Sequence, residues 1–77
     1  HYSAALAGLG EVCYRQGSLE RALENYEHAL FEVEKHLGRK EGYGLLCGNC
    51  AAICRELGQS AKAEEYEVQR KKYCPEA

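Results

Sequence analysis

Residues 6–30 read LAGLGEVCYRQGSLERALENYEHAL, and residues 47–71 read CGNCAAICRELGQSAKAEEYEVQRK. The two stretches share one skeleton at a spacing of 41 residues, which separates Gly17 from Gly58 and Ala22 from Ala63. A fixed period of this size indicates stacked helix pairs, each burying its apolar side against its neighbours. We therefore expect an all-α protein: an α-α superhelix of two helical hairpins and four helices.

The four helices are expected at about residues 2–16, 19–37, 42–57 and 61–74, within a single domain of residues 1–77. The first repeat then covers about residues 2–37, and the second about residues 42–75. The strongest periodic signal lies in the second helix, where apolar residues recur every three or four positions. Its members are Leu19, Ala22, Leu23, Tyr26, Ala29, Leu30, Val33 and Leu37. Short connections make neighbouring helices antiparallel, so each pair is a hairpin.

Both hairpin turns combine a glycine with a following serine. Gly17 precedes Ser18 directly, and Gly58 is followed by Gln59 and Ser60. Glycine ends helices because it adopts the left-handed backbone conformation at no steric cost. A serine at the start of the next helix can accept a hydrogen bond from one of its free N–H groups. We expect each turn to use a glycine stop and a serine cap.

The first and fourth helices differ in their apolar content. In the first helix, the seam is expected at Leu6, Leu9 and Cys13, with Gly10 allowing a close approach between helices. The fourth helix has one narrow seam that suits packing, and every other side carries charge. That seam consists of Ala63, Tyr66, Arg70 and Tyr73. Such a helix covers a core on one face and meets water on the other, as the closing element of a repeat stack does.

Composition narrows the classes of function. A net charge of −2 and an isoelectric point near 5.9 give no basic surface for nucleic acid. No apolar run approaches the roughly 20 residues that span a bilayer, so we expect no membrane insertion. No secretory leader is visible and the five cysteines form no disulfide framework, which favours a cytoplasmic, reducing location. Because methionine is absent, we expect the chain to be a piece of a longer protein.

The repeated skeleton resembles the tetratricopeptide repeat. That family's pattern is a large residue, Leu-Gly, Tyr, a turn glycine, Ala, an aromatic residue, Ala and a closing Pro. The matching residues are Leu6, Leu9, Gly10, Gly17, Ala22, Tyr26 and Ala29 in the first repeat, and Ala51, Gly58, Ala63 and Pro75 in the second. The second repeat departs from the pattern at Cys47, Cys50, Cys54, Glu67 and Arg70. The unit is longer than the usual repeat of about 34 residues, and in this it resembles kinesin light chains and the adaptors that link G-protein subunits to spindle machinery.

The resemblance implies a TPR-like solenoid that binds a protein or peptide ligand and carries no chemistry or cofactor. Members of the family hold a partner segment in a concave groove lined by the first helix of each pair. The groove residues implied here are Ala7, Glu11, Tyr14, Arg15, Leu45, Gly48, Asn49, Ala52 and Arg55, with Ala4 and Glu56 at the margin. We hypothesise that Arg55 pairs with an acidic group of the ligand while Tyr14 stacks beside it. The alternative is that both are ordinary surface residues.

Cys47, Cys50 and Cys54 admit two interpretations. Zn²⁺ binds thiolates in tetrahedral sites, but three cysteines on one helix would need a fourth ligand from elsewhere, such as Cys13 or Cys74. Free cysteine also packs as a small apolar residue, and these positions of the repeat need modest apolar bulk. Core packing is the interpretation that we favour.

The preferred function is a protein–protein interaction scaffold or adaptor module, in contact with further repeats of the parent chain. Two alternatives stay open: a structural capping or spacer pair within a larger solenoid, and a cysteine-ligated metal or redox module. No enzyme is expected, because aspartate is absent and no Ser-His-Asp arrangement, Cys-His arrangement or glycine-rich phosphate loop is found.

Overall fold

The chain folds as four α-helices. A computed structural model describes the backbone of residues 2–75 and the side chains of residues 5–75. The helices are α1 (Tyr2–Arg15), α2 (Leu19–Leu37), α3 (Glu41–Glu56) and α4 (Ser60–Tyr73), with no strand between residues 2 and 75. The prediction of an all-α chain with four helices is confirmed, and each observed boundary lies within one residue of the predicted one.

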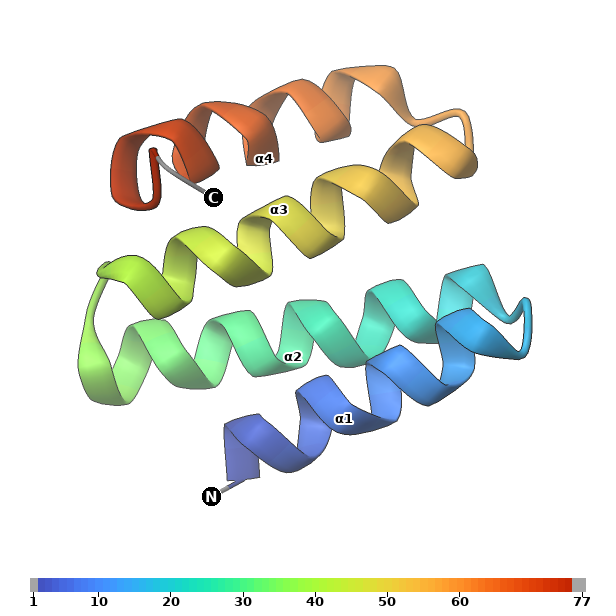
Figure 1. Ribbon diagram of the computed structural model, residues 1–77, viewed down its shortest axis with the longest axis horizontal. Coiled ribbons are helices and arrows are strands. Elements are labelled where there is room, and N and C mark those ends of the chain that lie inside the picture. The colour runs from blue at the N-terminus through green and yellow to red at the C-terminus, as the bar shows by residue number, and fades with distance from the viewer. Residues whose placement is uncertain (1, 76–77) are drawn as a thin grey trace.

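The helices pack in chain order as two antiparallel hairpins. Helix α1 packs on α2, α2 on α3, and α3 on α4. Figure 1 shows α1 and α4 at opposite ends of this row, with the two hairpins side by side. The arrangement is therefore an open row and not a bundle closed by contact between its first and last helices.

The two hairpin turns have the same backbone structure, 41 residues apart. Gly17 and Gly58 have φ angles of 81° and 80°, a conformation that strongly favours glycine. In the first turn, the N–H groups of Gly17 and Ser18 donate to the carbonyls of Tyr14 and Cys13. In the second turn, the N–H groups of Gly58 and Gln59 donate to the carbonyls of Arg55 and Cys54. This pair of bonds satisfies the last free carbonyls of each helix and reverses the chain.

The predicted serine caps are wrong. Ser18 precedes α2, but its side chain makes no capping hydrogen bond, and its φ and ψ angles of −88° and 72° lie outside the extended conformation that a capping serine usually adopts. Helix α4 begins at Ser60, so Gln59 takes the cap position, also without a side-chain bond. The predicted glycine stops are confirmed, because they depend on the backbone conformation alone.

The core lies mainly between α2, α3 and α4, in two clusters of buried side chains. The larger cluster contains Ala22, Leu23, Tyr26, Cys50, Ile53, Cys54 and Ala63, and the smaller one Leu30, Tyr43 and Cys47. The cysteines at 47, 50 and 54 are completely buried in these clusters. The interpretation of these three cysteines as small apolar core residues is thus confirmed. They provide bulk where neighbouring helices come close.

Two glycines allow close helix contacts. A Cβ atom on Gly10 would lie 2.9 Å from the ring of Tyr26, which confirms that this glycine permits a close approach of α1 to α2. At Gly44, a Cβ atom would lie 2.8 Å from the backbone nitrogen of Cys74, at the end of α4. Distances this short exclude larger side chains unless the helices move apart.

The apolar seams predicted for α1 and α2 are partly wrong. Leu9 is exposed, because α1 faces α2 and the core through Gly10 and Cys13 while Leu9 lies beyond the edge of that contact. Leu37 is exposed as well. It is the last residue of α2, beyond Val33, which still packs on the core.

Helix α4 is joined to α2 by polar contacts as well as by packing. Glu27 of α2 accepts a hydrogen bond from Tyr66 Oη at 2.6 Å and pairs with Lys62 Nζ at 2.7 Å. Burial, together with this hydrogen bond, raises the pKa of Tyr66 and keeps its hydroxyl protonated as the donor. These contacts hold the charged closing helix over the core.

Candidate functional site

A hollow of about 220 Å³ lies where α1, α2 and α3 meet. Tyr14 of α1 forms one wall, while Asn49 and Ala52 of α3 form the other. The floor consists of Tyr26 of α2 and Ile53 of α3, both buried in the core. One small site therefore combines residues of both repeats with side chains that the core holds in place.

A hydrogen bond between the two repeats fixes one wall of this hollow. Tyr14 Oη donates to a carboxylate oxygen of Glu56, the last residue of α3. This hydrogen bond to a negative acceptor raises the pKa of Tyr14, because it stabilises the protonated phenol. Tyr14 remains 41% exposed as a residue, so it can still contact a ligand.

The hollow contains three of the predicted groove residues: Tyr14, Asn49 and Ala52. Sequence reasoning missed Tyr26 and Ile53 as parts of the site. The periodicity of α2 identifies Tyr26 as a core residue, which it is, but periodicity alone does not show that a core side chain also forms the floor of a surface hollow.

The remaining predicted groove residues whose side chains are described do not line the hollow. Ala7 is partly buried and packs against the larger core cluster. Arg15 pairs with Glu11 at 2.6 Å on the exposed surface of α1, an ordinary pair four residues apart on one helix. Leu45 is exposed and takes no part in lining the hollow. Ala4, at the predicted margin, lies outside the residues whose side chains are described.

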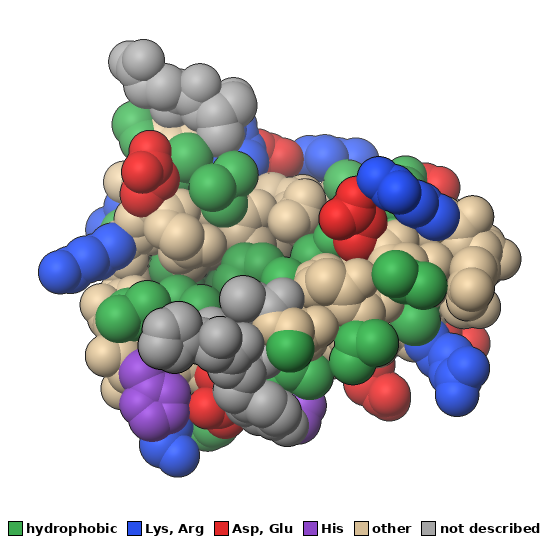
Figure 2. Space-filling view, turned by 60° about the horizontal axis from the view of Figure 1, so that its bottom comes forward, with side chains coloured by type: hydrophobic (Ala, Val, Ile, Leu, Met, Phe, Trp, Pro, Cys, Tyr) green, Lys and Arg blue, Asp and Glu red, His purple; other side chains and the backbone are tan. Residues whose placement is uncertain are grey.

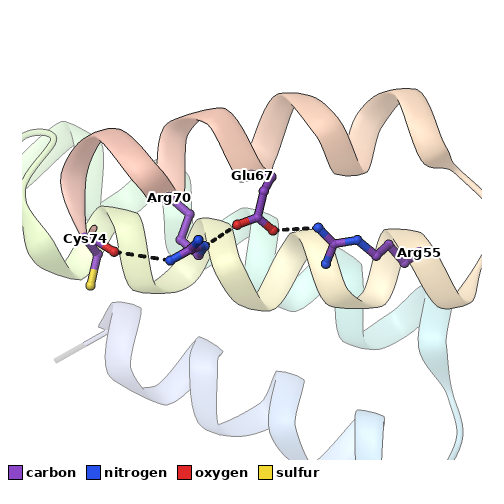
Figure 3. Close-up of polar contacts among 4 residues, drawn as sticks. All are labelled: Arg55, Glu67, Arg70 and Cys74. Carbon is purple, nitrogen blue, oxygen red and sulfur yellow. Dashed lines mark hydrogen bonds and ion pairs between the residues drawn. The ribbon is translucent and has the colours of Figure 1, made fainter. Parts of the chain in front are cut away.

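Arg55 and Gly48 face α4. The guanidinium of Arg55 donates a hydrogen bond of 2.6 Å to a carboxylate oxygen of Glu67 (Figure 3). Glu67 also accepts a hydrogen bond from Arg70 Nε. Arg70 in turn donates to the backbone carbonyl of Cys74 at 3.3 Å. A Cβ atom on Gly48 would lie 2.9 Å from Arg70 Cδ, so this glycine leaves room for the arginine side chain. An acidic ligand at Arg55 would therefore have to compete with Glu67.

The two arginines lower the pKa of Glu67. The main causes are the hydrogen bonds donated by Arg55 and Arg70, which stabilise the carboxylate. A carboxyl group whose pKa falls on folding adds stability above its ordinary pKa of 4.5 and loses that stability as it becomes protonated. Between about pH 6 and about pH 3, we expect the wild-type chain to lose more free energy of unfolding than Glu67→Gln. Urea unfolding at a series of pH values measures this difference.

The matched control for this prediction is Glu64→Gln, a change at an exposed position of the same helix. Its free energy of unfolding should follow the pH dependence of the wild type. An unchanged pH dependence in Glu67→Gln would show that the arginines add nothing to the stability of the fold through Glu67.

The buried cysteines are poorly suited to reactions that need a thiolate. Burial raises the pKa of Cys47 to about 11, and burial also raises the pKa of Cys50 and Cys54. These thiols are therefore protonated near neutral pH. Across the described residues, no three His, Cys, Asp or Glu side chains lie close enough together to hold a metal ion.

Comparisons with known proteins supply no relative: no protein-family model, curated protein or solved structure matches this chain. Within residues 2–75, none of the four helices is both long enough and apolar enough to cross a membrane.

Proposed function

We propose that the two hairpins form a tetratricopeptide-like superhelix and that the chain is a protein-interaction module. The equivalent turns at Gly17 and Gly58 support this fold, because their backbone hydrogen bonds match at the 41-residue spacing. Ala22 and Ala63, also 41 residues apart, are both buried in the core. The proposal includes a cytoplasmic location, where the five thiols of the chain would stay reduced.

The hollow between the repeats is the observation that carries the proposed function. Its volume of about 220 Å³ is below the roughly 300–1,000 Å³ of small-molecule pockets. It suits one apolar side chain of a bound peptide, which would rest on Tyr26 and Ile53 beside the Tyr14 ring. The exposed side-chain amide of Asn49 carries two N–H donors and one oxygen acceptor, so it can form hydrogen bonds with the peptide backbone. Tyrosine is also a residue type that often anchors protein interfaces.

Selection of peptides from a random displayed library tests this proposal. Selected peptides should bind the wild-type chain and lose at least about tenfold in affinity, or about 1.4 kcal/mol, against Ala52→Arg, which fills the hollow. Tyr14→Ala should weaken binding in the same direction, because it removes one wall. Fluorescence anisotropy of labelled peptides measures each affinity.

Phe31→Ser is the control, because Phe31 is an exposed apolar residue on α2 that does not line the hollow. Its affinity for the selected peptides should equal that of the wild type. Arg55→Ala adds a test of the pairing hypothesis: a loss of affinity would show that a ligand displaces Glu67. Peptides that bind all the hollow variants as well as the wild type would contradict the proposed site.

A second candidate, a capping pair that packs within a larger solenoid, is favoured by the charged outer side of α4. Exposed charged residues on this side include Glu64, Glu65, Lys71 and Lys72. A polar outer face is what the last helix of a repeat stack needs to stay soluble. A chain with this role alone would yield no peptide whose binding depends on the hollow, so the same selection separates the two functions.

A further inference from the structure

Helix α1 carries a row of exposed apolar residues beside the face that contacts α2. Ala5, Leu9 and Val12 follow one another at steps of four and three residues, which places them on one face of the helix. We refer to these three residues as the α1 outer stripe. Leu9 is 55% exposed and Val12 is 51% exposed. Figure 2 turns the α1 side of the molecule toward the viewer and shows hydrophobic side chains at this surface.

In the second repeat, the corresponding face of α3 is covered by another helix. The residues 41 positions after the α1 outer stripe are Leu46, Cys50 and Ile53 of α3. Cys50 is fully buried and Ile53 is 2% exposed, and both belong to the cluster that contains Leu23 and Tyr26 of α2. Leu46 is partly buried against the same cluster. The face exposed on α1 is thus the face through which α3 packs on the preceding helix.

We propose that the α1 outer stripe is a docking surface for an α-helix of a partner protein. Helix α2 shows the chemistry that the partner must have, because it occupies the corresponding place next to α3. Its stripe of Leu23, Tyr26 and Leu30 is apolar, buried and spaced by three and four residues. The partner helix presents a similar uncharged stripe and runs antiparallel to α1, as α2 does to α3.

A second copy of this chain does not fit the stripe in the same register. The residues of α4 that correspond to Leu23, Tyr26 and Leu30 are Glu64, Glu67 and Lys71. Glu64 and Lys71 are exposed, and Glu67 is held by two arginines. Placing Glu64 and Lys71 on the apolar side chains of Leu9 and Val12 would remove two charges from water without giving either an opposite charge on α1, which is costly. The α1 outer stripe is therefore apolar, while the α4 residues that would meet it are charged, so the partner differs from α4.

The test uses the whole chain, labelled with ¹⁵N, and a synthetic peptide of residues 18–38 as the probe. This peptide carries the α2 stripe. The expected result is a set of amide shift changes in the labelled chain centred on Leu9 and Val12. The double variant Leu9→Glu with Val12→Glu should lower the peptide affinity at least tenfold, as should Leu23→Glu with Leu30→Glu in the peptide.

Two control variants show whether the peptide binds at the α1 outer stripe, and a spectrum shows whether the stripe variant is folded. Leu45→Glu places a charge at an exposed leucine outside the stripe and should leave the affinity unchanged. Ala52→Arg blocks the hollow and should also leave it unchanged, so the proposed function and this surface can fail independently. Far-ultraviolet circular dichroism of the stripe variant should match that of the wild type, because neither changed side chain is buried.

Three outcomes would overturn the proposal. The first is the absence of shift changes at α1 up to millimolar peptide. The second is a set of shift changes centred on Asn49 and Ala52, which would place the peptide in the hollow. The third comes from sedimentation: a wild-type dimer that Leu9→Glu dissociates would assign the stripe to a second copy of the chain.

Discussion

Replacing Ile53 by alanine is expected to lower the free energy of unfolding by about 2–5 kcal/mol. Ile53 is 2% exposed, packs in the larger core cluster and also forms part of the floor of the hollow. Alanine would remove apolar contacts and leave a cavity that the rigid helices can fill only in part. Domains typically have about 0.05–0.15 kcal/mol of stability per residue, so this loss is a large share of the total for 77 residues.

Val12→Ala is the matched control, because Val12 occupies the corresponding position of the first repeat and is half-exposed. Its effect should stay within about 0.5 kcal/mol, as for other surface substitutions. Urea unfolding followed by circular dichroism measures the free energy of unfolding of both variants. If Ile53→Ala is unfolded, Ile53→Val replaces it, with an expected loss of about 0.5–1.5 kcal/mol. Equal losses at residues 12 and 53 would show that α1 is buried in solution on its outer side.

A second large effect is expected at Gly44, where alanine should destabilise the fold by about 1–3 kcal/mol. Its Cβ atom would lie 2.7 Å from Cys74 Cβ and 2.8 Å from the Cys74 backbone nitrogen. Backbone atoms cannot turn aside as a flexible side chain can, so α4 would have to move away from α3. This cost should exceed the gain of about 1 kcal/mol from replacing glycine by alanine in a helix. Thermal and urea unfolding both measure the change.

The control for this substitution is Gly8→Ala, within α1. A Cβ atom on Gly8 would have no neighbour within 4 Å, so only the helix preference of alanine acts there. This variant should therefore gain up to about 1 kcal/mol. Stabilisation by both alanines would mean that α3 and α4 are farther apart at Cys74 than the structure places them.

The helices and their turns could be predicted because their causes are local. The apolar period of residues 19–37 and the glycines at 17 and 58 depend only on nearby residues and the backbone. Part of the candidate site also followed from the repeat: Tyr14, Asn49 and Ala52 were expected in the groove, and all three line the hollow. The serine caps failed because their signal depends on a side-chain rotamer and a backbone angle that other residues influence.

Tertiary packing determined the rest, because burial depends on which helix lies alongside. Leu9 and Cys50 occupy the same position of the repeat, yet one is exposed and the other fully buried, since α3 lies between α2 and α4 while α1 lies at the end of the row. Arg55 could be predicted as a surface arginine, but its ion pair with Glu67 exists because the turn at Gly58 brings α4 back along α3. The 41-residue pattern was sufficient to identify four helices in two hairpins. Which faces of these helices meet each other, and which remain open to a partner, depended on contacts between residues far apart in the chain.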